Sequence, residues 1–141
     1  MCIRDRRHGR QADADPQPLF EYVVRQLAPL GLAYIHIIEG STGGPRELPD
    51  RPFDYAALKS AYREAGGQGA WMVNNGYDRD MALRAVESGH ADIVAFGKAF
   101  ISNPDLVHRL RDDLPLNPWN SSLFYGGGAE GYTDYPFARQ A

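Results

Sequence analysis

The stretch GLAYIHIIEG, residues 31–40, indicates the fold class of this chain. A glycine stands before a short apolar run, Tyr34–Ile38, and a Glu-Gly pair follows it. An apolar run of this length, rich in β-branched and aromatic residues, is typical of a buried strand in a parallel sheet. The preceding segment predicts a helix, because Asp15-Pro16 is a helix-start signature and apolar residues then recur at helical spacing up to Gly31.

The same helix-then-strand pattern recurs twice downstream. Residues 70–73 and 92–96 are two further short apolar runs, and each follows a segment with apolar residues at helical spacing. Asp78 is a candidate cap of the helix between these two strands, and Asn103-Pro104 opens a last predicted helix. Alternation of this kind predicts parallel βαβ units, with the three strands adjacent in chain order.

Three strands are too few for a complete fold of this class. A (β/α)8 barrel needs about 250 residues, and the chain has 141. A sheet of three parallel strands would also leave two long edges unpaired. The sequence therefore predicts an α/β chain that is part of something larger.

Composition excludes several classes of function. Hydrophobic residues make up 43% of the chain, charged residues 23%, and the net charge is −3 with both signs scattered. We therefore expect no nucleic-acid partner and no membrane association. The only cysteine is Cys2, so neither an internal disulfide nor a cysteine metal site can form, and a reducing, cytoplasmic location is the expectation.

The first ten residues, MCIRDRRHGR, differ from the rest. They are charge-dense, have no hydrophobic periodicity and lack the apolar region of a signal peptide. We expect residues 1–10 to be either a non-native leader or a disordered native terminus. Residues 11–141 are expected to form the folded portion, including a C-terminal tail.

Two loops combine glycine with a polar or basic residue directly after a predicted strand. They contain Asn75-Gly76 and Gly97-Lys98. Glycine lets backbone N–H groups approach an oxyanion, and a cation completes such a cradle. In (β/α)8 barrels the loops after the last two strands often form a phosphate site. The alternative is that both glycines only serve turns and that Lys98 is a solvated charge.

The four histidines show no metal-ligand spacing. His36 lies in the middle of a predicted strand, where a hydrogen-bonded core residue is the favoured interpretation over a catalytic base. His90 and His108 fall near helix ends and are expected at the surface. His8 belongs to the leader. We predict no metal site.

The tail, FYGGGAEGYTDYP at residues 124–136, mixes glycines with aromatic residues. Its glycines allow left-handed backbone conformations, and its rings could pack on a flat ligand or on a neighbouring subunit. A strap over the outer helices is an equally good interpretation of the spacing.

Taken together, residues 95–98, 101–106 and 124–136 closely resemble the C-terminus of Old Yellow Enzyme-type flavin oxidoreductases, in particular the N-ethylmaleimide reductase and alkene reductase branch. The resemblance extends back through Tyr34 to about Asp13. It implies a (β/α)8 TIM barrel with FMN at its mouth, of which this chain would supply strands six to eight.

The resemblance also implies roles for particular residues. Backbone groups at Asn75 and Gly76, together with Gly97 and Lys98, would hold the FMN phosphate, and Tyr125 would lie on the substrate side. Lys98 departs from the family's arginine and loses its bidentate fork, so weaker flavin binding is expected. The implied activity is reduction of activated alkenes, such as α,β-unsaturated carbonyls or nitro compounds, with NAD(P)H. The catalytic residues are expected upstream, with none in this chain.

Two alternatives stay open at this point. One is another phosphate-binding barrel enzyme, for which Glu39 is the only candidate catalytic group at a strand end. The other is that the chain is an inactive, truncated product. Neither the preferred alkene, the choice between NADH and NADPH, nor the oligomeric state follows from the sequence.

Overall fold

The structure, a computed structural model, describes residues 2–4, 15–41, 44–46, 52–125 and 128–138. The chain divides into two compact units, Met1–Ala95 and Phe96–Ala141. Unit 1 holds all the strands among the described residues, and unit 2 is built from short helices and extended segments. No helix among the described residues is long and apolar enough to cross a membrane.

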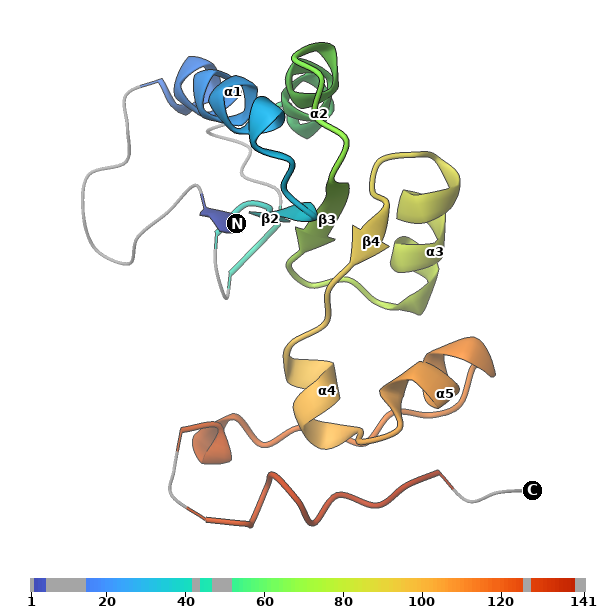
Figure 1. Ribbon diagram of the computed structural model, residues 1–141. Coiled ribbons are helices and arrows are strands. Elements are labelled where there is room, and N and C mark those ends of the chain that lie inside the picture. The colour runs from blue at the N-terminus through green and yellow to red at the C-terminus, as the bar shows by residue number, and fades with distance from the viewer. Residues whose placement is uncertain (1, 5–14, 42–43, 47–51, 126–127, 139–141) are drawn as a thin grey trace. The chain divides into compact units, whose positions relative to one another are not determined.

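Unit 1 is built on one parallel sheet in the order β1-β2-β3-β4 (Figure 1). Its strands are β1 (Cys2–Arg4), β2 (Tyr34–Ile38), β3 (Ala70–Asn74) and β4 (Ile93–Val94). The register between β2 and β3 runs from Tyr34 opposite Ala70 to Ile38 opposite Asn74. The predicted order and parallel direction of the last three strands are confirmed, although β4 ends two residues earlier than expected.

β1 was not expected. Cys2–Arg4 pair in parallel with β2, so this part of the leader lies at the edge of the sheet. The unpaired N–H and C=O groups along the edge of β2 offer a template that any short extended segment can join, which explains the pairing without a sequence signal. Residues 5–10 lie outside the described part of the chain, and a foreign origin of the leader stays a prediction.

The helices of unit 1 follow the predicted alternation. They are α1 (Pro16–Leu27), the 3-10 turn η1 (Ala28–Leu30), α2 (Tyr55–Glu64) and α3 (Arg79–Glu87). Asp78 caps α3 as predicted, since its carboxylate accepts from the Met81 N–H at 2.8 Å. Asp15 makes no side-chain cap bond, contrary to expectation, and α1 relies on proline in its first turn instead.

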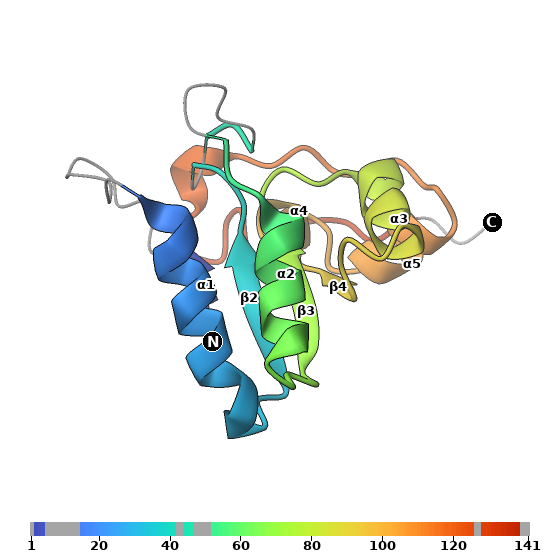
Figure 2. The ribbon, with the colours of Figure 1, turned by 90° about the horizontal axis from the view of Figure 1, so that it is seen from above.

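Helices α1 and α2 lie side by side along the β2–β3 part of the sheet (Figure 2). The side chains that alternate toward them are fully or almost fully buried: Ile35, Ile37, Trp71 and Val73. Trp71 packs against Tyr62 of α2 with 5.9 Å between ring centroids. Because side chains alternate across a strand, this core uses one face of β2 and β3 only.

Asp92 links the start of β4 to its neighbours. Its carboxylate accepts from the Trp71 N–H at 2.6 Å and pairs with Lys59 at 3.1 Å and Arg63 at 2.7 Å. Burial raises the pKa of Asp92, but the backbone N–H and the two cations outweigh it and hold that pKa below its ordinary value. One side chain thus ties α2, β3 and β4 together.

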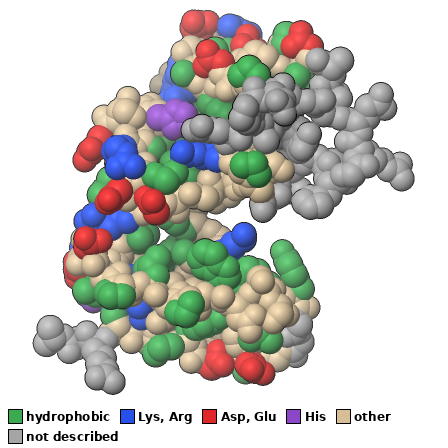
Figure 3. All heavy atoms as spheres, turned by 180° about the vertical axis from the view of Figure 1, so that it is seen from behind, with side chains coloured by type: hydrophobic (Ala, Val, Ile, Leu, Met, Phe, Trp, Pro, Cys, Tyr) green, Lys and Arg blue, Asp and Glu red, His purple; other side chains and the backbone are tan. Residues whose placement is uncertain are grey.

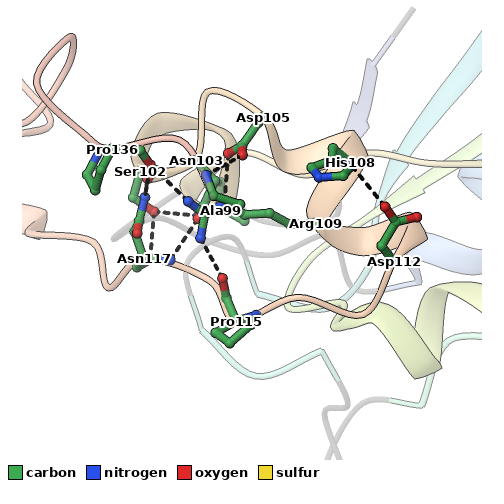
Figure 4. A network of polar contacts seen from close by, with 11 residues as sticks. Ala99, Ser102, Asn103, Asp105, His108, Arg109, Asp112, Pro115, Asn117 and Pro136 are labelled. Carbon is green, nitrogen blue, oxygen red and sulfur yellow. Dashed lines mark hydrogen bonds and ion pairs between the residues drawn. The ribbon is translucent and has the colours of Figure 1, made fainter. Parts of the chain in front are cut away.

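Unit 2 contains α4 (Lys98–Ser102), α5 (Leu106–Arg111) and the 3-10 turn η2 (Ser121–Leu123). The last predicted helix therefore starts at Leu106 rather than at Asn103-Pro104, and α4 was not foreseen. Asn103 is instead a buried bridge between segments (Figure 4): its amide donates to the Ala99 carbonyl and accepts from the Asn117 N–H.

A buried arginine holds the tail of unit 2. Arg109 is 5% exposed, and its guanidinium donates to Asp105 at 2.7 Å and to the carbonyls of Pro115 and Pro136. Asp105 in turn accepts from the Ala138 N–H at 2.7 Å. Two of the three acceptors of Arg109 are backbone carbonyls in irregular segments. Side-chain hydrogen bonds thus satisfy backbone groups that a β-sheet would pair with a neighbouring strand. This is how unit 2 orders its tail.

The two units differ in character on the face that Figure 3 shows. Figure 3 shows charged side chains of both signs over unit 1 and hydrophobic side chains gathered on the visible face of unit 2. The large exposed apolar residues of unit 2 are Phe100, Val107, Leu116, Trp119, Tyr125, Tyr132 and Phe137. An apolar surface of this kind is typical of a segment that normally packs against further protein.

Candidate functional site

The loop after β3 carries the first predicted pair. Asn75 has φ = 118° and Gly76 has φ = 67°, so two successive residues adopt left-handed backbone conformations. The Asn75 amide donates to the carbonyls of Glu39 at 2.6 Å and Ser41 at 3.1 Å. A Cβ built on Gly76 would meet nothing within 4 Å. The turn is therefore held by a side chain while its backbone borders open space.

The N–H groups of Asn75 and Gly76 make no hydrogen bond to another described residue. Two neighbouring backbone donors in a left-handed turn form a concave, electropositive surface that suits an oxyanion. This part of the structure therefore fits a phosphate, with contact through the backbone rather than through the Asn75 amide.

The second predicted pair stands at the start of α4. Gly97 is its N-cap residue, with φ = −97°, and a Cβ there would also meet nothing within 4 Å. Lys98 is exposed, and its ammonium lies 6.0 Å from the centroid of the Trp119 ring. Because the φ value of Gly97 suits any residue, only close approach of another group would require glycine at this position.

The structure brings together the members of each pair but not the two pairs. Asn75 and Gly76 belong to unit 1, whereas Gly97 and Lys98 belong to unit 2. Their convergence on one concave spot stays a prediction.

Tyr125, the predicted substrate-side residue, is fully exposed. Its neighbour Phe124 is buried and accepts a hydrogen bond from the Tyr132 hydroxyl at 2.8 Å through its carbonyl. The tail is thus folded back on itself at this point, with the Tyr125 ring directed outward. Its role toward a substrate stays a prediction.

A polar cluster in unit 1 was missed by sequence reasoning. The Glu39 carboxylate is buried, and it accepts from the Tyr77 hydroxyl at 2.7 Å and contacts His90 Nε2 at 2.6 Å. We call these three residues the Glu39 cluster. Burial raises the pKa of Tyr77, and the hydrogen bond to Glu39 raises it further, so the phenol stays a neutral donor.

The Glu39 cluster borders an open cavity of about 480 Å³, which Arg46, Tyr55 and Arg84 also line. The Arg46 guanidinium lies 4.8 Å from the centroid of the Tyr77 ring. His90, expected at the surface, is 34% exposed and also contacts the buried Glu39, 51 residues away in sequence. Contacts over such a separation leave no local pattern, although the acidic strand end at Glu39 was a partial signal.

His36 and His108 show no catalytic arrangement with other described residues. His36 is not hydrogen-bonded as expected: its Nε2 is buried without a partner among the described residues, and burial lowers its pKa. His108 lies 3.0 Å from Asp112. His8 lies outside the described residues. Within the described part of the chain, no group of three or more His, Cys, Asp or Glu side chains could hold a metal ion.

Comparisons with known proteins place the chain in a family. The model of the NADH:flavin oxidoreductase / NADH oxidase family matches residues 14–117. A rice protein named 12-oxophytodienoate reductase 7 is 39% identical over 144 residues, covering 91% of this chain and 35% of its own length. Chanoclavine-I aldehyde reductase of Penicillium roqueforti is 39% identical over 132 residues, covering 89% of this chain and 34% of its own length.

Solved structures agree. The old yellow enzyme from Trypanosoma cruzi superposes with a TM-score of 0.79 at 33% identity, covering 91% of this chain and 32% of that one. Morphinone reductase gives a TM-score of 0.75 at 36% identity, covering 90% and 32%. These neighbours are (β/α)8 barrels, which confirms the predicted fold class. The chain spans about a third of the length of these relatives, and it belongs to the NADH:flavin oxidoreductase / NADH oxidase family, the family of the old yellow enzymes.

Proposed function

We propose that this chain is the flavin-phosphate side of an FMN-dependent ene-reductase. The observation that carries the proposal is the family match over residues 14–117, which includes both glycine-bearing loops. In this proposal the chain supplies strands six to eight of the barrel, and the groups that grip and protonate the substrate lie on strands upstream of it. The proposed substrates are activated alkenes such as α,β-unsaturated carbonyls or nitro compounds, as in the N-ethylmaleimide reductase branch.

FMN, when bound, would take a hydride from NAD(P)H and pass it to the alkene. The residues of this chain would bind and orient it. The N–H groups of Asn75 and Gly76, which have no partner among the described residues, would donate to the phosphate. Lys98 would add a point charge from the start of α4. The missing Cβ at Gly97 would allow close backbone approach, and Tyr125 would present its ring on the substrate side.

The alternative of another phosphate-binding barrel enzyme loses its support. The family match points to flavin oxidoreductases, and Glu39, the only carboxylate that qualified for that alternative, is buried and bound to Tyr77 and His90. A cytoplasmic location and the absence of a nucleic-acid partner remain part of the proposal, on the grounds of cysteine usage and charge.

Substitutions that change the charge at position 98 test whether Lys98 contacts the FMN phosphate. They are made in the full-length protein that contains this segment. Lys98→Glu should weaken FMN binding by roughly 10- to 100-fold, because a charge-assisted hydrogen bond is replaced by repulsion. Lys98→Arg, which restores a bidentate fork, should bind FMN at least as tightly as the wild type. Flavin fluorescence titration measures both. Equal affinity of the Glu variant and the wild type would contradict the assignment.

The chain by itself should reduce no alkene. Residues 11–141 lack five strands of the proposed barrel and every proposed proton donor, so added FMN should bind poorly. The assay is NADPH oxidation with a maleimide or cyclohexenone. Turnover above a no-protein control would show that the catalytic groups are not upstream, and the inactive-product alternative would then also be wrong.

A further inference from the structure

We infer that Glu39 is a positioning residue that holds the turn at Asn75 and Gly76 in its phosphate-binding conformation. The inference rests on the proposed function, because it concerns how the proposed phosphate site is kept in shape. Glu39 itself would touch neither FMN nor substrate, since its side chain is 4% exposed and its carboxylate oxygens contact Tyr77 and His90.

All the polar groups of Glu39 are engaged, and three of the contacts go to Asn75 or to the residues that flank the turn, Asn74 and Tyr77. Its N–H donates to the Asn74 carbonyl at 3.0 Å, and its carbonyl accepts from the Asn75 amide at 2.6 Å. Its carboxylate accepts from the Tyr77 hydroxyl at 2.7 Å. The residues on both sides of Gly76 are therefore tied to one residue of the preceding strand end.

The turn needs such support because its conformation is unfavourable for Asn75. A φ of 118° is rare for a residue other than glycine and persists only where the surroundings impose it. The Asn75 amide is held by the Glu39 and Ser41 carbonyls, so the side chain fixes the turn. Loss of the ties would let the turn relax and move its backbone N–H groups.

The Glu39 carboxylate is kept in place from its other side. His90 contacts Oε1 at 2.6 Å while Tyr77 occupies Oε2, so each oxygen has its own partner. The raised pKa of Tyr77 keeps its hydroxyl a donor at physiological pH. A buried carboxylate with a partner at each oxygen is held rigidly, so it can hold Tyr77 and the adjoining turn in one conformation.

The test compares FMN with riboflavin, which lacks the phosphate, in the full-length protein. Glu39→Gln and Tyr77→Phe are the test variants, and Glu87→Gln is the matched control, because Glu87 is exposed on α3 and has no side-chain partner among the described residues. The dissociation constants of both flavins are measured, together with the ³¹P shift of bound FMN.

We expect Glu39→Gln to weaken FMN binding about tenfold and to move the ³¹P signal, while riboflavin affinity stays within about twofold. Tyr77→Phe should weaken FMN binding by about threefold to tenfold, since it removes the hydrogen bond from the Tyr77 hydroxyl to Glu39. If Glu39→Gln does not fold, the Tyr77→Phe result tests the inference. Glu87→Gln should change neither flavin.

Equal loss of FMN and riboflavin affinity would overturn the inference, because it would mean that Glu39 only stabilises the fold. Unchanged affinity for both flavins would overturn it as well. Failure of the proposed function is recognised separately: the wild type would then bind riboflavin as tightly as FMN, and Lys98→Glu would have no effect.

Discussion

The two faces of the β2–β3 sheet differ sharply in how well they are packed. On the helix side, Ile35 and Ile37 are at most 1% exposed and contact α1 and α2. On the other side, Tyr34 is 43% exposed, and His36 keeps a buried nitrogen without a partner among the described residues. Within unit 1, helices therefore cover one face of β2 and β3. The opposite face carries Tyr34 and His36 but is packed less tightly among the described residues.

This difference shows which face of the sheet is buried by elements of this chain alone. A barrel strand buries one face under its helices and the other in the barrel interior. The chain brings its own helices, so the first kind of burial is satisfied. The second kind depends on strands from across the barrel, and the proposal that this chain is one side of a barrel accounts for the half-exposed face.

The largest expected effect comes from two adjacent isoleucines on opposite faces. Ile37→Ala should lower the free energy of unfolding of residues 1–141 by about 2–5 kcal/mol, because it opens a cavity in a closed core. Ile38→Ala, the same change one residue along the strand, should cost about 1 kcal/mol or less. Urea denaturation followed by circular dichroism measures both. Equal losses would mean that the two faces are equally well packed.

A smaller effect should follow from Asp92, which ties the helix side together. Asp92→Asn should cost about 1–2 kcal/mol, a modest value because the side chain is 38% exposed and solvent screens its ion pairs. The lowered pKa of Asp92 means that its carboxylate stabilises the fold above the unfolded pKa of about 3.9. That contribution is lost as the pH falls through the folded value.

The pH dependence supplies the control for this prediction. The difference in unfolding free energy between wild type and Asp92→Asn should be constant from neutral pH to about pH 5 and should shrink in more acidic solution. A difference that grows on acidification would mean that the carboxylate is not the stabilising form.

The smallest expected effect is the difference in stability between substitutions at the N-cap residues of α1 and α2. Asp54 accepts from the Ala57 N–H at 2.8 Å, so Asp54→Ala should cost about 1 kcal/mol. Asp15 makes no such bond, so Asp15→Ala should be almost neutral. The same denaturation assay checks the pair. If the two changes cost the same, the start of α1 is capped in solution after all.

Local patterns carried most of the fold prediction. Tyr34–Ile38 could be predicted as a strand because its signal lies in consecutive residues, although only Ile35 and Ile37 are buried. The capping role of Asp78 follows from its place before a helical pattern. β1 and α4 could not be predicted: one is three residues long and pairs only because an edge is available, and the other is a five-residue helix directly behind Gly97.

The candidate site divides in the same way. Gly76 and Gly97 could be found from their places after strands, and both border open space. The contacts of Glu39 with Tyr77 and His90 could not be found, because they join residues 38 and 51 positions apart through packing of α3 on the sheet. The backbone of Asn75 was expected to serve a ligand, and this stays a prediction. That its side chain holds the turn through the Glu39 and Ser41 carbonyls was not foreseen.

The arginine that holds the tail of unit 2 has a consequence for proteolysis. Arg109 and Pro136 are 27 residues apart, and the intervening chain acts as a tether that keeps a high effective concentration of the tail beside α5. A single cut in that tether would turn an intramolecular contact into a bimolecular one between a protein and a short peptide. At micromolar protein concentration the peptide would dissociate, and the Arg109 guanidinium would lose the Pro136 carbonyl as an acceptor. Water could replace this acceptor only if unit 2 opened to admit it.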